Sequence, residues 1–367
     1  MKKDKDKNND LEVNVLMLGG RRCGKTSLLT TMYNSFDTTF GSTDLTITAT
    51  DNDTLNILIE KNKDILKLLE TKSHSFEADE KDNAGPNTGS DNYYKFTIGI
   101  KGKSRGKIKL KFIDYPGEWL GNKEHESFFT EKIQQADVIL ITIDTPFLMQ
   151  KSGKNNEYKN HSYQIAELLK THLEDGLNGD NVSKMILFVP IKCERYYYTE
   201  NNMYNLKERI KAVYGNLISH INNEAYRNKC EMAITPVLTL GTIEFSRFKR
   251  GLDAEPETHD TYGTFIPLYV FRDGVPHEQQ PLYCEQPLIY ILLYLIKRAE
   301  VARNKKKESR FWILKMLKSA VVSIEEKFFE MPSADDFVQQ SDKLKSKLES
   351  QMYGYEIITD PLKLKQK

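Results

Sequence analysis

The sequence has few cysteines and no long hydrophobic run. Its four cysteines are far apart in 367 residues and form no CxxC pair, which disfavours a disulfide framework or a zinc ribbon and favours free thiols. The longest apolar run, 287–296, is about half of the ~20 residues that a membrane-spanning helix needs. The charged start, 1–10, leads into no apolar stretch of signal-peptide length. We therefore expect a cytoplasmic protein without a membrane span.

An excess of charge of one sign is also missing. Lysine and arginine total 53 against 52 acidic residues, which gives a formal net charge of +1. No overall field therefore favours nucleic acid as a partner, and the short basic runs at 101–107 and 305–307 are typical of solvated faces. The seven histidines show no HExxH spacing, and no GxSxG motif occurs. These absences disfavour a metal hydrolase and a serine hydrolase.

Hydrophobic residues make up 39% of the chain and charged residues 29%, enough to build a globular core. Short apolar runs alternate with amphipathic segments, and the alternation predicts an α/β fold: a doubly wound, mostly parallel sheet of about six strands with an antiparallel edge hairpin. The expected strands are 11–18, 93–100, 107–114, 137–144, 185–191 and 232–240. The expected helices are 25–34, 124–135, 161–173, 205–226 and 285–303.

The domain organisation follows from the same pattern. We expect a disordered tail over 1–10, a main domain over 11–303 and a helical extension over 304–367. Two insertions interrupt the main domain: 37–91, with an amphipathic helix at 54–72, and 246–283, a large loop with a small hairpin. In the extension, helices are predicted at 311–329 and from Ser333 onward.

The strongest motif lies between the first strand and the first helix. The sequence GGRRCGKT fits GxxxxGKT, the pattern of a phosphate-binding loop. Main-chain N–H groups of such a loop surround the phosphates, Lys25 reaches the terminal phosphates, and the Thr26 hydroxyl can bind Mg²⁺. The predicted nucleotide-binding residues here are Gly19, Gly20, Arg21, Arg22, Cys23, Gly24, Lys25, Thr26 and Ser27.

A second motif ends the third predicted strand. Asp114-Tyr115-Pro116-Gly117 fits DxxG, in which the aspartate holds Mg²⁺ and the glycine N–H binds a γ-phosphate. Alone, this tetrapeptide is a common turn. After a phosphate-binding loop and a hairpin, it indicates a nucleoside triphosphate site.

With these residues the chain resembles P-loop GTPases of the translation-factor and small-GTPase (TRAFAC) class. Within that class it is most similar to the bacterial double-GTPase-type families of conflict and defence systems, through the DYPGE step at 114–118, the long insertion before the second strand, and CEQPL at 284–288. The resemblance implies a molecular switch that binds GTP or GDP with Mg²⁺. It also implies a protein effector or a second GTPase as partner.

The resemblance places the base-reading NKxD motif at the end of the fifth strand. This chain has Ile191-Lys192-Cys193-Glu194 there, so the lysine is kept, while isoleucine replaces asparagine and glutamate replaces aspartate. Glu194 could still accept from the guanine N1 and N2 donors, which favours GTP over ATP. A further loop at 239–242, with Gly241, matches the place where such proteins contact the base through backbone N–H groups.

The resemblance also implies a switch threonine that binds Mg²⁺ when the γ-phosphate is present. We choose Thr88, in the Gly/Asn-rich turn before the second strand, with Thr46 and Thr48 as rivals. Such a loop can order on the γ-phosphate and relax after hydrolysis.

The residues for hydrolysis predict slow turnover. Glu118 follows Gly117 where many small GTPases have glutamine; its carboxylate could orient water but would bring negative charge to a polyanion. Arg21 or Arg22 could reach the γ-phosphate as a built-in arginine finger, although a solvated arginine is the commoner outcome. The predicted catalytic set is Lys25, Glu118, Thr88 and Arg21. A nucleotide-binding scaffold with little hydrolysis and a P-loop ATPase or kinase stay open as alternatives.

Overall fold

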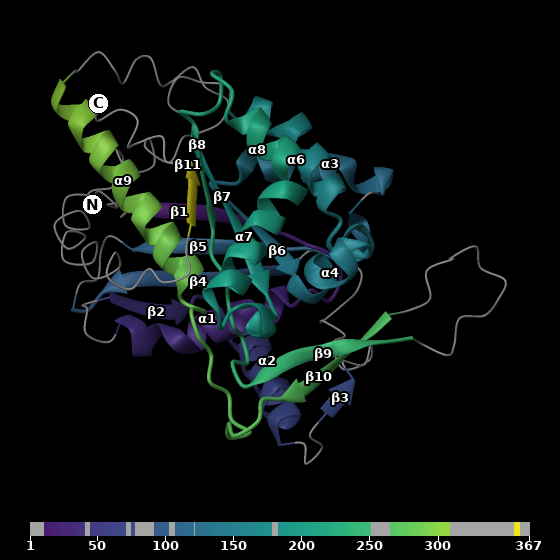
Figure 1. The fold of residues 1–367 in the computed structure, drawn as a ribbon. Coiled ribbons are helices and arrows are strands. Elements are labelled where there is room, and N and C mark those ends of the chain that lie inside the picture. Colours follow the sequence, from purple (N-terminus) through teal and green to yellow (C-terminus); the bar gives the residue numbers. More distant parts are fainter. Residues whose placement is uncertain are drawn as a thin grey trace.

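The computed structural model describes residues 11–40, 45–70, 75–77, 92–102, 107–120, 122–177, 183–250, 265–308 and 356–359. Over these residues the chain builds an eight-stranded sheet flanked by helices, and a smaller three-stranded sheet lies beside it (Figure 1). The α/β fold and the mostly parallel sheet predicted from the sequence are confirmed.

The large sheet has the strand order β11-β8-β7-β6-β1-β5-β4-β2. Its five central strands, from β8 to β5, run parallel, whereas β4, β2 and β11 are antiparallel to their neighbours. The strands are β1 (Leu11–Leu18), β2 (Leu45–Ala49), β4 (Asn92–Ile100), β5 (Ile108–Asp114), β6 (Val138–Asp144), β7 (Lys184–Ile191), β8 (Cys230–Ile234) and β11 (Glu356–Thr359).

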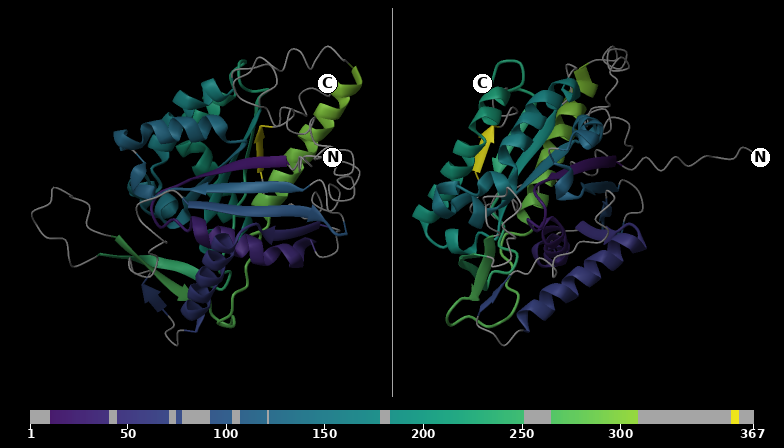
Figure 2. Two further views of the ribbon diagram at one scale, coloured as in Figure 1. Left: turned by 180° about the vertical axis from the view of Figure 1, so that it is seen from behind. Right: turned by 90° about the vertical axis from the view of Figure 1, so that its right-hand side faces the viewer.

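Helices cover both faces of this sheet (Figure 2). One face packs against α1 (Lys25–Phe40), α9 (Gln286–Glu308) and part of α2 (Asn52–Leu69). The other packs against α3 (Glu126–Gln135), α6 (Ser162–Gly176), α7 (Glu200–Val213) and α8 (Gly215–Ile221). Two short helices, α4 (Thr145–Met149) and α5 (Asn156–Asn160), follow β6. Four single-turn 3₁₀ segments are η1 (Gly117–Trp119), η2 (Lys123–His125), η3 (Gln150–Gly153) and η4 (Glu194–Tyr196).

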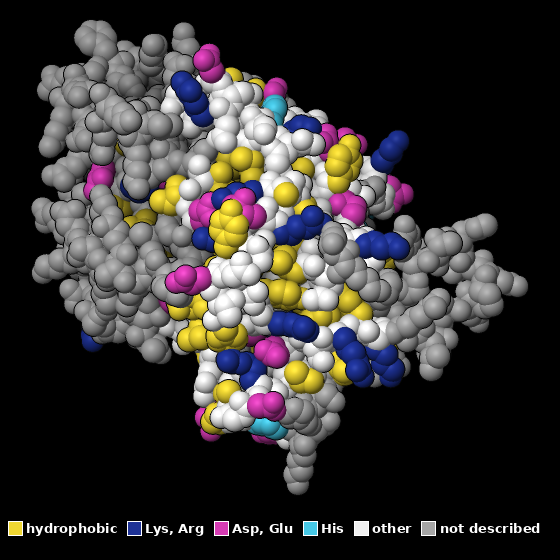
Figure 3. Space-filling model, viewed as in Figure 1, with side chains coloured by type: hydrophobic (Ala, Val, Ile, Leu, Met, Phe, Trp, Pro, Cys, Tyr) yellow, Lys and Arg dark blue, Asp and Glu magenta, His cyan; other side chains and the backbone are white. Residues whose placement is uncertain are grey.

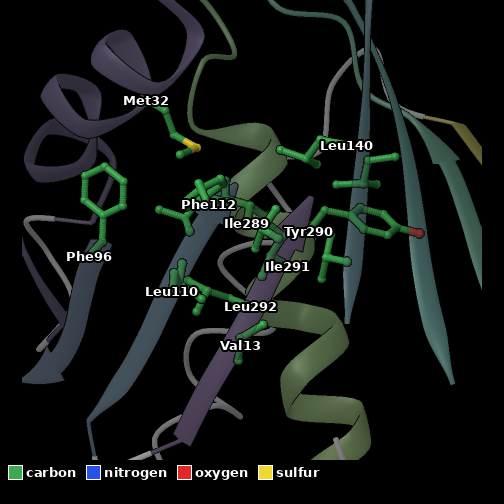
Figure 4. Close-up of a cluster of buried hydrophobic side chains, with 14 of the residues drawn as sticks. Val13, Met32, Phe96, Leu110, Phe112, Leu140, Ile289, Tyr290, Ile291 and Leu292 are labelled. Carbon is green, nitrogen blue, oxygen red and sulfur yellow. The ribbon is translucent and has the colours of Figure 1, made fainter. Parts of the chain in front are cut away.

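The alternation of side chains along β1 explains the two layers. Val13, Val15 and Met17 face the α1 and α9 layer, while Leu16 and Leu18 face the other. The apolar start of α9 is almost completely buried, and Figure 4 shows Ile289–Leu292 among side chains from the sheet and from α1. This helix therefore belongs to the core that supports the strand ends.

The small sheet joins the two predicted insertions. Its order is β3 (Ser75–Glu77), β10 (Phe265–Phe271) and β9 (Ile243–Arg250), all antiparallel. The hairpin expected within 246–283 is present as β9 and β10. Ile65 and Leu69 of α2 pack on its apolar side chains, which include Phe245 and Phe271. The insertions thus form one satellite layer with a core of its own.

The structure differs from the sequence prediction in its edges and in one helix. The sheet has eight strands where about six were predicted, because β2 and β11 are short edge strands at 45–49 and 356–359. The helix expected over 205–226 is two helices that meet at Tyr214, directly before Gly215. The helices predicted at 311–329 and from Ser333 lie outside the described residues.

Two surface features bear on the expected partners. In the described part of the chain, no helix is long and apolar enough to cross a membrane. On the face drawn in Figure 3, basic and acidic side chains of the described residues are interspersed.

Candidate functional site

The predicted phosphate-binding loop connects β1 to α1 at the carboxyl end of the parallel strands. The predicted residues follow one another from the loop into the first turn of α1: Gly19, Gly20, Arg21, Arg22, Cys23, Gly24, Lys25, Thr26 and Ser27. The buried Cys23 thiol lies 3.1 Å from the Thr142 hydroxyl of β6. The Gly19 N–H donates to the Tyr115 hydroxyl at 3.3 Å. The loop is therefore tied to two neighbouring strands.

Lys25 points back into this loop. Its Nζ donates to the Gly19 carbonyl at 3.1 Å and lies 3.4 Å from Asp114 Oδ1, and the residue is only 7% exposed. Burial by itself lowers the pKa of Lys25, but the Asp114 carboxylate outweighs it, so the pKa is raised. The side chain stays an ammonium ion enclosed by the loop.

The Asp114 carboxylate and the Thr26 hydroxyl fit a magnesium site. The Thr26 side chain interacts with the Asp114 carboxylate. Asp114 Oδ1 is buried and ion-paired with Lys25, but it accepts no hydrogen bond from the described groups. Mg²⁺ prefers hard oxygen ligands and usually takes one or two from the protein and the rest from phosphates and water. No cluster of three or more His, Cys, Asp or Glu that could hold a metal occurs in the described ranges. Two protein oxygens beside a phosphate-binding loop match that preference.

Gly117 brings the second motif against the first. A Cβ atom at Gly117 would lie 2.1 Å from the Arg21 backbone nitrogen and 2.5 Å from its Cα, so only glycine fits at this approach. The Gly117 backbone therefore lies directly beside the phosphate-binding loop. The side chain of Glu118 lies outside the described part of the structure, and so does Thr88.

Lys192 ties the predicted base-reading segment to the phosphate-binding loop. Its Nζ donates to the Arg22 carbonyl at 3.3 Å and to Asp144 Oδ2 at 2.7 Å. Burial lowers the pKa of Lys192, but the Asp144 carboxylate, which is fully buried, outweighs it and the pKa is raised. The ion pair fixes the loop after β7 at the end of β6.

Glu194 is buried and turned toward the 239–242 loop. Its Oε1 accepts the N–H groups of Leu240 and Gly241, both at 3.3 Å, and the residue is 3% exposed. Burial raises its pKa to about 7. One carboxylate oxygen is thus engaged with the backbone of the loop predicted to contact the base.

The 239–242 loop is itself held by the chain that precedes α9. Gln280 N–H donates to the Leu240 carbonyl at 3.1 Å, and the Thr242 hydroxyl donates to the Glu278 carbonyl at 2.9 Å. The structure therefore brings the two phosphate motifs, Lys192, Glu194 and Gly241 to one end of the sheet.

Several residues at this end were not predicted from the sequence. Asp144 gave a signal, since it ends a buried parallel strand, where functional side chains gather. Tyr115 lay inside the DxxG motif at a variable position. Lys159 of α5 gave no signal in the sequence. Its carbonyl oxygen would lie 1.9 Å from a Cβ atom at Gly20 of the phosphate-binding loop, a contact that depends on how α5 folds back.

A family comparison decides the class of this site. The family model described as Double-GTPase 2 matches residues 15–182, which contain both phosphate motifs. Over these residues the chain is similar to the double-GTPase family. The resemblance seen in the motifs is confirmed for these residues. A comparison with curated proteins finds no match.

Solved structures give distant likenesses. The S. cerevisiae Ski7 GTPase-like domain bound to GDP and inorganic phosphate is 15% identical, with a TM-score of 0.39, over 63% of this chain and 43% of that one. The signal recognition particle receptor SRb-GTP/SRX complex from Chaetomium thermophilum is 13% identical, with a TM-score of 0.35, over 62% of this chain and 91% of that one. The chain thus spans less than half the length of the Ski7 structure.

Proposed function

We propose that this protein is a molecular switch that binds GTP or GDP with Mg²⁺ and hydrolyses GTP slowly. The observation that carries the proposal is the enclosed Lys25 ammonium, bonded to the Gly19 carbonyl and paired with Asp114. A buried ammonium and backbone N–H groups at a helix start form a site for a polyanion. The similarity of 15–182 to the double-GTPase family supports the same ligand.

The protein's own groups divide the work of binding. In this proposal the N–H groups of the 19–24 loop surround the phosphates, and Lys25 contacts the terminal ones. Thr26 and Asp114 hold Mg²⁺, with Thr88 joining them when the γ-phosphate is present. Bound Mg²⁺ neutralises charge on the phosphate oxygens. The Gly117 N–H senses the γ-phosphate.

Guanine is the base we propose. Lys192 lies along the base, and Glu194 and the backbone at Gly241 read its edge. The preference for one base over another then depends on the Glu194 carboxyl group, whose pKa is about 7. One oxygen of this group accepts from the backbone of the 239–242 loop. The guanine edge offers two donors, N1 and N2, to such an acceptor, whereas adenine lacks this pair of donors.

We expect slow hydrolysis because the negative charge of Glu118 would repel the phosphates. Arg21 is the candidate for a built-in arginine finger. An arginine finger is worth roughly 10³ to 10⁵ in rate. We expect Arg21→Ala to slow single-turnover phosphate release at saturating GTP. An unchanged single-turnover rate would remove Arg21 from the catalytic set.

The partner proposed is a protein effector or a second GTPase, in a cytoplasmic conflict, defence or signalling system of bacteria. Nucleotide state would be passed on through 37–91 and 115–130. No nucleic acid is included in this proposal.

A titration with GTP, GDP and ATP, each with Mg²⁺, tests the function. We expect binding of GTP and GDP, weaker binding of ATP, and slow phosphate release from GTP. Preference for ATP would favour the ATPase alternative. Binding of GTP with phosphate release at background would favour the nucleotide-binding scaffold, which the acidic Glu118 supports.

A further inference from the structure

The chain between β6 and α6 packs against the phosphate-binding loop. A Cβ atom at Gly20 would lie 1.9 Å from the carbonyl oxygen of Lys159 and 3.2 Å from the His161 ring. The backbone of α5 therefore touches the loop directly. None of the known motifs of the site includes this segment.

A network of buried amide side chains fixes the segment in place. Asn160, fully buried, accepts the Asp144 N–H at 2.7 Å and donates to the Asp144 carbonyl at 3.1 Å. It also donates to Asn156 at 2.9 Å. His161 ends α5 in the left-handed region with φ 49°. Such paired hydrogen bonds hold a short helix that has little stability alone.

This anchoring holds the cationic residue Lys159 of α5 beside the phosphate-binding loop. Lys159 Nζ lies 5.5 Å from the centre of the Phe147 ring. The charged groups that act on it are Lys192, Asp144 and Arg22. Of these the Asp144 carboxylate is already paired with Lys192.

This gathering of positive charge is unfavourable by itself. Burial, followed by the neighbouring Lys192 charge, lowers the pKa of Lys159. Burial also lowers the pKa of Lys61 of α2; the Asp64 carboxylate opposes this shift, and the Lys192 charge adds to it. The charges of Lys159 of α5 and Lys61 of α2 thus both interact unfavourably with that of Lys192, and an anionic ligand would offset this repulsion.

We propose that Lys159 is a further ligand of the bound nucleotide, whose ammonium group contacts the phosphate chain from outside the known motifs. The inference rests on the proposed function and adds a contact to it. The geometry that supports it is the contact of α5 with Gly20 and the anchoring of Asn160 to the end of β6. The competing role is structural, with Lys159 only packing on Phe147.

Three variants separate the two roles. Lys159→Met removes the charge and keeps most of the packing, Lys159→Arg keeps the charge, and Lys154→Met removes an exposed lysine of the same segment as the control. Binding of GTP, GDP and guanosine is measured by calorimetry with Mg²⁺. We expect Lys159→Met to weaken GTP and GDP about tenfold or more, with guanosine unchanged. Lys159→Arg should restore most of the affinity, and the control should bind like the wild type.

Two results would overturn the inference while leaving the proposed function intact: wild-type affinity of Lys159→Met for GTP, or an equal loss for GTP and guanosine, which would indicate packing. If the wild-type protein binds neither GTP nor GDP, the proposed function fails and this inference fails with it. Salt dependence adds a second readout, since loss of a phosphate contact lowers the slope of log affinity against log salt.

Discussion

At the scale of single residues, buried charges are concentrated where β1, β6 and β7 end. Lys25 pairs with Asp114 and Lys192 pairs with Asp144, so each cation has an anion on a neighbouring element. Glu194 differs, because its carboxylate is held by backbone N–H groups. Breaking such a pair by removing one partner leaves a buried charge uncompensated, which is costly.

Glu194 makes stability depend on pH. Its ordinary pKa is 4.5 and burial raises it to about 7 in the folded protein. Between these values the folded chain keeps a proton that the unfolded chain releases, so stability falls as pH rises from about 4.5 to about 7 and stays low above that. Glu194→Gln has no carboxyl group at this position and so does not lose this stability. The free energy of unfolding of Glu194→Gln minus that of wild type should therefore be about 2 to 3 kcal/mol larger at pH 8 than at pH 5.

Urea unfolding of both proteins at the two pH values measures this difference in free energy. Lys170→Met, which removes a lysine on α6 whose side chain is 28% exposed, is a control for surface charge. A difference between Glu194→Gln and wild type that is the same at both pH values would contradict a raised pKa at Glu194.

At the scale of elements, aromatic side chains link the second motif to α3. The Trp119 ring of η1 stacks on His125 with centroids 4.1 Å apart, and it meets Phe128 edge-on at 5.2 Å. Phe129 in turn meets Tyr115 at 4.7 Å, and the Tyr115 hydroxyl accepts from Gly19. This aromatic cluster connects the phosphate-binding loop to the segment proposed to respond to nucleotide.

Trp119 should therefore report the nucleotide state. The chain has two tryptophans, Trp119 and Trp312, so Trp312→Phe isolates the emission of Trp119. We expect a non-hydrolysable GTP analogue to shift this emission more than GDP does, because a contact at Gly117 moves the stacked ring. Equal emission with the two nucleotides would show that η1 does not respond to the γ-phosphate.

The elements also show what could be predicted from the sequence. Buried parallel strands have continuous apolar runs and long helices have a clear period, so the central sheet was predictable. The phosphate motifs were predictable from their residue patterns at the ends of two such strands. Strands β2 and β11 are five and four residues long at the sheet edges, too short for a clear pattern. Lys159 could not be predicted, because its place depends on Asn160 reaching Asp144 across a fold that no local pattern encodes.

At the scale of the whole molecule, the strand ends that carry the site are supported by α9, more than 250 residues further along the chain than the phosphate-binding loop. Leu292 is fully buried in the same cluster as Val13 and Leu110 (Figure 4). Leu292→Ala should lower the free energy of unfolding by about 2 to 5 kcal/mol. Leu55→Ala, at a site on α2 that is 37% exposed, should cost much less.

Chemical denaturation compares the two variants directly. If Leu292→Ala costs no more than Leu55→Ala, α9 does not contribute to the core as described. A large loss at Leu292 alone is the result expected for a helix that completes the packing of the sheet.

The central claim is that the 19–25 loop and its lysine bind the phosphates of GTP. Calorimetric titration of GTP with Mg²⁺ into wild type, Lys25→Met and the control Lys170→Met tests it most directly. The account predicts binding by wild type and the control, and a loss of roughly a hundredfold or more in Lys25→Met, since a charged contact to phosphate is lost and Asp114 is left unpaired. Equal affinity of Lys25→Met and wild type for GTP, with all three proteins folded, would contradict it.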